Sequence, residues 1–385
     1  SPTGVPTGAY DVTIPSTAND PVITNNGTQR STHDLIIESG ATLTLPDDTL
    51  IIVYGGLQVD GTLVNGNSQG IRFNYRNTGS KTLSGTGSQS AVIYQMYGDY
   101  VMSSSWSIKS LHVVSTSDGS SLTVNDGLTL TIDSSLVNSQ TITLSGSANL
   151  TIGEDFTNSS SFTMGTGTIT FNGSENSVID DPDGISFYNL TINKDATADV
   201  VSLNDADADL TVTNNLLITE GTLNNGAAEL SVSGTTTLTD GELIGGTEEI
   251  SLTGDITLNN DAWMTLSSSS VGMIFRGSLT MNGTSGLRNT GGATTGFALR
   301  GTTTQTISSN TPANSSSARV YVGDSDYDVD LITDWSIALM TLSSTSGTGD
   351  FSIATGKTLT IAGLINQSGN VATALTLSGT ANMDV

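Results

Sequence analysis

Two short rows of aspartates have the spacing that places carboxylates on one face of a β-strand. Every second side chain of a strand lies on the same face, with about 7 Å between successive carboxylates. Such oxygen-rich rows suit Ca²⁺, which takes about six to eight oxygen ligands. Neither row has the glycine and distal glutamate of an EF-hand loop, so a solvated acidic face, or a loose divalent-ion site between neighbouring molecules, is favoured over a specific site. The calcium candidates are Asp324, Asp326, Asp328 and Asp330 in one row and Asp205, Asp207 and Asp209 in the other.

The densest group of carboxylates is Asp180-Asp181-Pro182-Asp183-Gly184. Two carboxylates at short range can serve as the acid and the nucleophile of glycoside hydrolysis. The same residues are ordinary turn formers, because Asp, Pro and Gly each favour a tight change of chain direction. The only histidines, His33 and His112, lie in different parts of the chain. The turn is the favoured interpretation, and no catalytic residue is predicted.

Two arginines and three tyrosines are candidates for binding an acidic partner or a sugar. Arg276 and Arg300 occupy the same position in two successive repeats of the sequence, each directly before a glycine. Stacked guanidinium groups can hold carboxylates, and we expect them to pair with acids of this chain. Tyr94, Tyr97 and Tyr100 could form a platform for sugar rings. Because aromatic residues make up only 5% of the chain, we expect these tyrosines mainly to pack in the core and at corners.

Composition narrows the classes of function. The chain of 385 residues has 11 Lys and Arg against 37 Asp and Glu, a formal net charge of −26. This balance argues against nucleic acid or an anionic membrane as a partner, since no basic patch is available to neutralise phosphates. The absence of cysteine excludes disulfides and thiolate metal sites. No apolar run approaches the roughly 20 residues of a membrane span, so membrane insertion is not expected.

A repeat of about twenty residues organises the chain. Segments that begin at Leu210, Leu230, Ile250, Met273 and Phe297 align, with starts 20, 20, 23 and 24 residues apart. Less regular matches extend this period over nearly the whole sequence. Within each segment apolar residues alternate with Thr or Ser, which indicates strands with one buried face. A glycine or asparagine often follows the first strand, where we expect a corner.

A unit of this length holds two or three short strands and no useful helix. It cannot enclose its own apolar face, so successive units must stack and share one core. Each strand then lies parallel to its equivalent in the next turn, about 4.8 Å away. The sequence therefore predicts an all-β fold, a right-handed parallel β-helix (β-solenoid) of about 18 coils, right-handed because parallel crossovers almost always are. A sandwich or barrel built from hairpins is the less favoured alternative.

A longer duplication is superimposed on this repeat. Residues 73–152 reappear, in approximate bounds, as residues 297–385, and the motifs that match between the two copies are offset by 227 to 233 residues. The clearest match is between Trp106-Ser107-Ile108 and Trp335-Ser336-Ile337.

The two ends of the chain differ in composition. Residues 1–34 hold four of the seven prolines and are predicted to form an N-terminal cap or arm, because proline blocks ladder pairing. Residues 35–385 are predicted to form the solenoid. Nothing after Leu375 resembles a cap, so we expect an uncapped last coil, whose unpaired strand edges would template pairing with another chain.

The segments at residues 34–45, 167–174 and 187–192 carry repeat phrases rich in Leu, Ile, Thr and Asn. These phrases resemble the repeats of bacterial secreted β-helix surface proteins, a group that includes filamentous-haemagglutinin-like adhesins and exported surface proteins of gliding bacteria. The resemblance is one of repeat style and covers most of residues 10–385. It implies an extracellular, cell-surface role that is structural or adhesive, and it carries no catalytic motif to this chain.

The sequence as a whole predicts an extracellular structural protein that is not an enzyme. It would be a subunit or segment of a cell-surface filament, sheath or adhesin stalk, a head-to-tail homopolymer joined through uncapped solenoid ends. Surface glycans are further candidate partners, and no cofactor is expected beyond Ca²⁺ at the aspartate rows. The alternative is a carbohydrate-binding or carbohydrate-cleaving β-helix of tailspike type. A cleaving enzyme would need a solvent groove with carboxylates within about 5–10 Å of each other. The Gly-His-Gly turn and Arg-Ile-Lys strand of pectin-cleaving β-helices are missing from the sequence.

Overall fold

The computed structural model describes most of the chain, and its described residues are all-β with almost no helix. Their parallel strands stack as a β-solenoid, as the sequence predicted. Among them, no helix is long and apolar enough to cross a membrane. The described residues are 8–17, 21–23, 30–46, 49–65, 70–74, 79–89, 92–114, 119–204, 209–267, 270–290, 295–301, 303–323, 328–343, 350–363, 365–368, 375–377 and 382–384.

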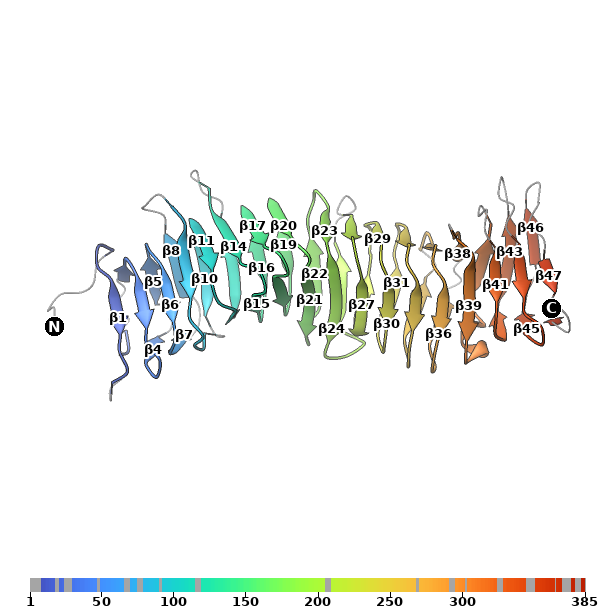
Figure 1. Ribbon diagram of the computed structural model, residues 1–385, viewed down its shortest axis with the longest axis horizontal. Coiled ribbons are helices and arrows are strands. Elements are labelled where there is room, and N and C mark those ends of the chain that lie inside the picture. The colour runs from blue at the N-terminus through green and yellow to red at the C-terminus, as the bar shows by residue number, and fades with distance from the viewer. Residues whose placement is uncertain are drawn as a thin grey trace. The chain divides into compact units, whose positions relative to one another are not determined.

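The chain divides into two units, unit 1 at residues 1–173 and unit 2 at residues 174–385. In each unit the strands of successive turns lie side by side, as Figure 1 shows.

In unit 1, sheet A consists, in spatial order, of β1 (Val12–Ile14), β3 (Leu35–Ile37), β6 (Leu57–Val59), β9 (Lys81–Ser84), β11 (Asp99–Met102), β14 (Ser121–Val124), β17 (Thr141–Leu144) and β20 (Ser161–Met164). Sheet B consists of β4 (Thr42–Leu45) and β7 (Thr62–Asn65). Sheet C1 consists of β2 (Arg30–Thr32), β5 (Leu50–Val53), β8 (Gly70–Asn74), β10 (Ile93–Tyr97), β13 (Ser110–Val113), β16 (Leu136–Asn138) and β19 (Phe156–Asn158). Sheet D1 consists of β12 (Trp106–Ile108), β15 (Thr129–Ile132), β18 (Asn149–Ile152) and β21 (Thr168–Gly173).

In unit 2, sheet C2 consists of β22 (Ser177–Asp180), β25 (Val200–Leu203), β28 (Thr222–Asn224), β31 (Glu242–Gly245), β34 (Trp263–Leu266) and β37 (Gly286–Asn289). Sheet D2 consists of β24 (Asn189–Lys194), β27 (Leu216–Glu220), β30 (Thr236–Leu238), β33 (Ile256–Leu258), β36 (Leu279–Met281), β39 (Gln305–Ser309), β41 (Val329–Leu331), β44 (Phe351–Ile353) and β47 (Leu375–Leu377). Sheet E consists of β23 (Ile185–Phe187), β26 (Leu210–Val212), β29 (Leu230–Val232), β32 (Ile250–Leu252), β35 (Met273–Phe275), β38 (Phe297–Leu299), β40 (Arg319–Val322), β43 (Leu339–Ser343) and β46 (Ile365–Ser368). Sheet F consists of β42 (Trp335–Ile337), β45 (Thr358–Ile361) and β48 (Asn382–Asp384), and the 3₁₀ helix η1 spans Pro312–Ser315.

The alternation of apolar and hydroxyl residues explains why these segments are strands. In β15, Leu130 and Ile132 are buried, whereas Thr129 and Thr131 lie on the outer face. Leu130 pairs in turn with Leu150 of the next strand, so leucine stacks on leucine along the core. Stacking of this kind buries the apolar face that a single turn leaves open.

The predicted repeat starts fall into one register. In sheet E, Leu210 pairs with Leu230, which pairs with Ile250, then Met273, then Phe297. One turn of unit 2 runs through sheets E, D2 and C2 in that order, which is the strand–corner–strand–corner–strand pattern of the sequence.

The solenoid has about 14 turns, not the 18 predicted from the sequence. Several turns are longer than twenty residues, since Ile185 pairs with Leu210 and Leu279 pairs with Ile307. The sequence match that begins at Leu190 falls on sheet D2 rather than sheet E, so its twenty-residue distance from Leu210 is less than a full turn. Counting matches therefore overestimated the number of turns.

Parallel pairing begins within the segment predicted as a cap or arm. Val12 to Ile14 of β1 pair with Leu35 to Ile37, and β2 pairs with β5.

The glycine corner of unit 2 is set by contact between turns. A Cβ atom on Gly254 would lie 2.3 Å from the carbonyl oxygen of Gly234, and one on Gly277 would lie 2.3 Å from that of Gly254. None of the three has a positive φ. Glycine is needed here because successive backbones approach too closely for any side chain, and not because the corner needs a left-handed conformation.

The two copies of the tryptophan motif each begin a sheet. β12, with Trp106, is the first strand of sheet D1, and β42, with Trp335, is the first strand of sheet F. In unit 2 the helix η1 packs against both β37, the last strand of sheet C2, and β42. Both tryptophans are buried, at 4% and 1% exposure, and pair with leucine in the next strand. A large indole thus fills the core where a new ladder begins.

Candidate functional site

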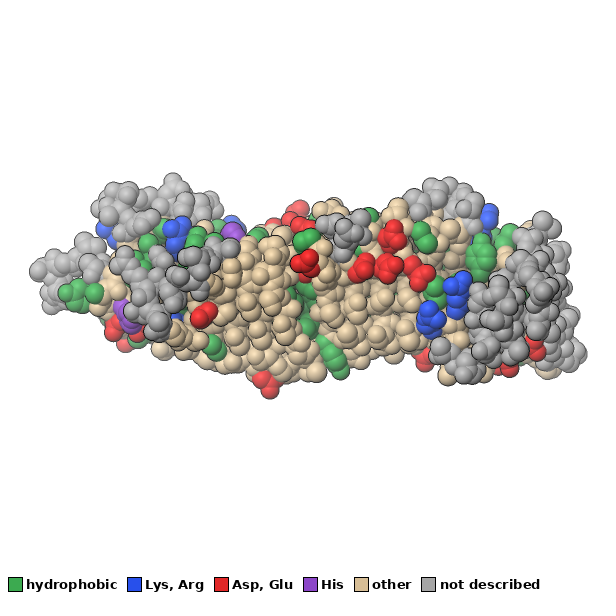
Figure 2. Space-filling view, turned by 90° about the horizontal axis from the view of Figure 1, so that it is seen from above, with side chains coloured by type: hydrophobic (Ala, Val, Ile, Leu, Met, Phe, Trp, Pro, Cys, Tyr) green, Lys and Arg blue, Asp and Glu red, His purple; other side chains and the backbone are tan. Residues whose placement is uncertain are grey.

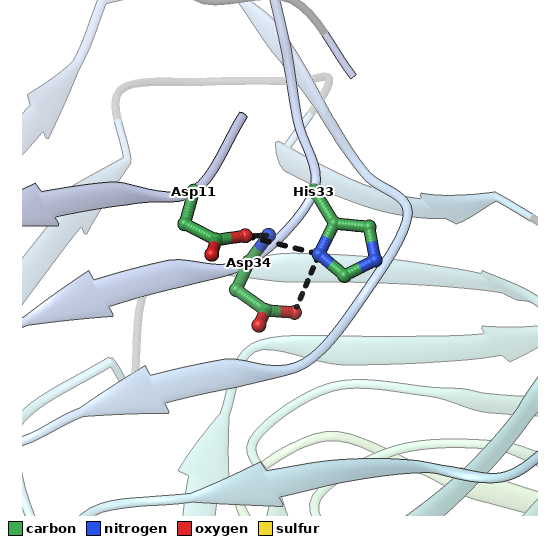
Figure 3. A group of neighbouring side chains, drawn as sticks. All are labelled: Asp11, His33 and Asp34. Atoms are coloured by element: carbon green, nitrogen blue, oxygen red, sulfur yellow. Dashed lines mark hydrogen bonds and ion pairs between the residues drawn. The ribbon is translucent and has the colours of Figure 1, made fainter. Parts of the chain in front are cut away.

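Asp11, His33 and Asp34 form the one group of His, Cys, Asp and Glu side chains in the described part of the chain that has metal-ligand spacing (Figure 3). Asp11 directly precedes β1, and His33 and Asp34 lie between β2 and β3. Because Val12 pairs with Leu35, the parallel register brings Asp11 beside Asp34. One potential ligand atom from each residue lies within 4.8 Å of the other two.

Hydrogen bonds within the protein already engage the atoms of this group. His33 Nδ1 lies 3.0 Å from Asp11 Oδ1 and 3.3 Å from Asp34 Oδ1 (Figure 3). Asp11 Oδ1 also accepts the backbone N–H of Asp34 at 3.2 Å, and Asp34 Oδ1 accepts that of Gly56 at 2.7 Å. The same oxygens that would bind a cation therefore close a corner between turns.

Sequence reasoning missed this group because it treated His33 as isolated. The signal was present in the spacing, since Asp11 and Asp34 are 23 residues apart, which is one turn of the solenoid.

The aspartate rows are only partly within the described residues. Asp205, Asp207, Asp324 and Asp326 lie outside them, whereas Asp209, Asp328 and Asp330 lie inside.

Each of the three described aspartates bonds to the next turn. Asp209 Oδ1 accepts the N–H of Glu229 at 3.1 Å, and Asp328 Oδ1 accepts that of Asp350 at 3.0 Å. Asp330, in β41, accepts a hydrogen bond from the Ser352 hydroxyl. These contacts give the three carboxylates a role in stacking that needs no bound ion.

The same contact recurs at many corners of both units. An Asp or Asn oxygen accepts the backbone N–H of the equivalent residue one turn later, a donor that the parallel ladder leaves unpaired. This explains why the corners are rich in Asp and Asn without implying an acidic binding site. Examples are Asp126 to Ser147 at 2.7 Å, Asn149 to Thr168 at 2.8 Å, Asn215 to Thr235 at 3.0 Å, Asp255 to Ser278 at 2.9 Å and Asp334 to Thr358 at 2.8 Å.

The corner contact lowers the pKa of the Asp126 carboxyl group. The backbone N–H and the hydroxyl of Ser147 both donate to its carboxylate and hold its pKa below the usual 3.8. A lowered folded-state pKa means that the contact stabilises the fold above pH 3.8 and is lost as the pH falls through the lowered pKa. We expect the carboxyl ¹³C shift of Asp126 to titrate below 3.8, and the Ser147→Ala substitution to move the midpoint upward without restoring it, because the backbone donor remains. A midpoint at 3.8 in the unsubstituted protein would contradict this account.

The Asp180–Gly184 segment is a turn, as the sequence favoured. The N–H of Gly184 donates to the carbonyl oxygen of Asp181 at 3.1 Å, and the N–H of Asp183 donates to Asp181 Oδ1 at 3.1 Å. Gly184 has φ +77°, a value that disfavours other residues.

The tyrosines belong mainly to the core, as expected. Tyr94 and Tyr100 are buried, and the Phe73 ring lies 5.5 Å from the first and 4.6 Å from the second. Burial raises the pKa of both phenols. Tyr97 is half-buried beneath the guanidinium group of Arg72, 5.4 Å from its ring centroid. None of the three offers an open ring face of the kind a sugar platform needs.

The two arginines occupy one column. Their expected pairing with acids stays a prediction, because Asp324 and Asp326, which follow the residue opposite Arg300 in the next turn, lie outside the described residues. Arg276 and Arg300 follow Phe275 and Leu299, which are paired in sheet E. Neither side chain has a hydrogen-bond or ion-pair partner among the described residues, whereas Arg288 pairs with Glu242 at 2.7 Å.

A hollow of about 270 Å³ lies on sheet E of unit 2. Glu249, Arg300 and Tyr321 line it together with the outward-facing Ile274 and Ala298. Glu249 is the one carboxylate among its described lining residues.

No protein-family model, curated protein or solved structure matches the chain, so the fold and these contacts carry the functional argument.

Proposed function

We propose that the chain is an extracellular structural protein, a subunit or segment of a cell-surface filament, sheath or adhesin stalk that assembles head to tail. The observation that carries the proposal is the first described turn of unit 1, where the stack is open. β1 and β2 pair with β3 and β5 on one side, and no described strand lies on their other side. Unpaired strand edges template the addition of further strands.

Among the described residues, the core is also uncovered at this turn. A cavity of about 300 Å³ is lined by apolar residues that include Val12, Ile14, Val22 and Leu35. Val22 is 61% exposed, which makes it one of the most exposed large hydrophobic side chains among the described residues. A second copy stacked on this turn would cover both the strand edge and the cavity. The contact is heterologous, so it propagates into a polymer.

The outer surface suits a structural role. Thr and Ser fill the outward positions of strands such as Thr129–Ile132 and Ile250–Leu252, which leaves few charges to desolvate when molecules pack closely.

A charge at the open edge tests the proposal. Val22→Asp places a carboxylate at the mouth of the cavity, where it would have to be buried on assembly. We expect the unsubstituted chain to form polymers that grow with concentration in negative-stain microscopy and light scattering, and Val22→Asp to abolish them. Val64→Asp is the matched control, since Val64 is exposed on β7 and does not line the cavity. Polymers of Val22→Asp that match those of the control, or an unsubstituted chain that stays monomeric at every concentration, would refute end-to-end assembly.

A further inference from the structure

Three acids form a column at one end of the strands of sheet E. Asp209, Glu229 and Glu249 directly precede β26, β29 and β32. The N–H of Leu210 donates to the carbonyl oxygen of Glu229, and that of Leu230 to Glu249, so the three residues lie one above another in successive turns. They repeat at the strand spacing of about 4.8 Å. Asp209 and Glu229 are exposed and Glu249 is half-buried.

Two arginines form a column in the next two turns of the same sheet. Arg276 and Arg300 directly follow β35 and β38, which pair with each other. Arg300 is exposed and Arg276 is half-buried. Their guanidinium groups, like the carboxylates of Glu229 and Glu249, have no hydrogen-bond or ion-pair partner within the described parts of the chain.

Within one molecule, a column of like charges has an unfavourable electrostatic energy. Like charges at the strand spacing repel each other, and alternating the signs would have given salt bridges instead. In Figure 2 a group of acidic side chains lies next to a group of basic ones on one face of the molecule. The arrangement becomes favourable when another surface supplies the opposite charges.

We propose that this face of sheet E is an interface between two copies of the chain. The patch is self-complementary, because a two-fold axis between the columns brings the acidic column of each copy against the basic column of the other. Each arginine then gains a carboxylate partner, which it lacks among the described residues of its own chain. An acidic partner of another kind would satisfy the arginines but would leave the acidic column unpaired, which is why a second copy is the occupant.

The surface between the columns suits such a contact. The hollow that Glu249 and Arg300 both line also includes two outward-facing apolar residues, Ile274 and Ala298, which are only 6% and 9% exposed. Closing it would remove water from around the charge pairs and strengthen them. This side-by-side pairing goes beyond the end-to-end assembly proposed above and stands without it.

The experiment measures side-by-side dimerisation in a variant whose end-to-end assembly is prevented by Val22→Asp. In the Val22→Asp background we expect sedimentation velocity to show dimers at an ionic strength of about 0.01 M, where the screening length is about 30 Å, and weaker dimers at about 0.1 M, where it is about 10 Å. Reversing one column, by Arg276→Glu with Arg300→Glu or by Glu229→Arg with Glu249→Arg, should weaken self-association more than about a hundredfold.

Mixing the two reversed variants tests directly whether the acidic column of one copy binds the basic column of another. One variant then has two acidic columns and the other two basic columns, so they should form a heterodimer although neither forms a homodimer. Combining all four substitutions in one chain should restore the homodimer. The control is Glu38→Arg with Glu175→Arg, which makes the same charge change at exposed sites away from the patch and should leave the homodimer intact.

Three outcomes would overturn the proposal. These are a chain that is monomeric at low salt, a dimer that survives reversal of one column, and a mixture of reversed variants that does not associate. Retention of an acidic oligosaccharide by the monomer, with loss on Arg276→Glu, would assign the arginines to a glycan instead. End-to-end polymers test a different contact, so either assembly can fail without the other.

Discussion

Replacing Trp335 by alanine is expected to lower the free energy of unfolding by about 3–5 kcal/mol, and replacing Trp106 to do the same. Each indole is buried where a new sheet begins, and in unit 1 the Trp106 ring packs 5.7 Å from that of Tyr94. Alanine leaves a cavity in a core that successive turns share, so neighbouring strands cannot collapse into it without losing their register.

Phenylalanine at these positions should be much better tolerated. The Nε1 atoms of Trp106 and Trp335 are buried and have no hydrogen-bond acceptor among the described residues. A phenyl ring therefore keeps most of the apolar contact and removes an unsatisfied donor. Denaturant unfolding of Trp335→Ala and Trp335→Phe would measure the two losses in free energy of unfolding. Trp263→Ala is the control, because Trp263 is half-exposed on the outer face of β34. Equal losses for Trp335→Ala and Trp263→Ala would contradict the assigned role.

Gly254→Ala is expected to cost about 3 kcal/mol, the upper part of the range for an overpacked site. The new methyl group would lie 2.3 Å from the carbonyl oxygen and 2.5 Å from the carbonyl carbon of Gly234, and backbone atoms cannot rotate away as a side chain can. Relief requires a shift between whole turns. Thr253→Ala is the control, because Thr253 is exposed and adjacent. A loss below about 1 kcal/mol in thermal or denaturant unfolding of Gly254→Ala would show that the corner is looser than these contacts imply.

The stacked architecture could be predicted because the information lies in periodicity. Alternation of Leu or Ile with Thr fixes which face is buried, and the repeat from Leu210 to Phe297 fixes which residues pair. The number of turns could not be predicted equally well, because corner length varies and an apolar start such as Leu190 can lie on a different sheet.

The candidate sites were harder to predict because they depend on what lies across a turn. The grouping of His33 with Asp11 needs the register of β1 with β3, and at the weakly repetitive start of the chain the one-turn spacing of Asp11 and Asp34 is the only sign of that register. The arginine column was recognised, but which acids approach it depends on where the acids of neighbouring turns lie, and among the described residues none pairs with it. The sequence showed the tryptophan duplication, yet the fact that each copy begins a sheet emerges only from strand pairing.

Electron cryo-microscopy of the assembled chain tests end-to-end stacking. We expect polymers in which the first described turn of each copy lies against another copy, with strands continuing across the junction at about 4.8 Å. Molecules that remain single at high concentration, or assemblies in which β1 and β2 face solvent, would contradict it.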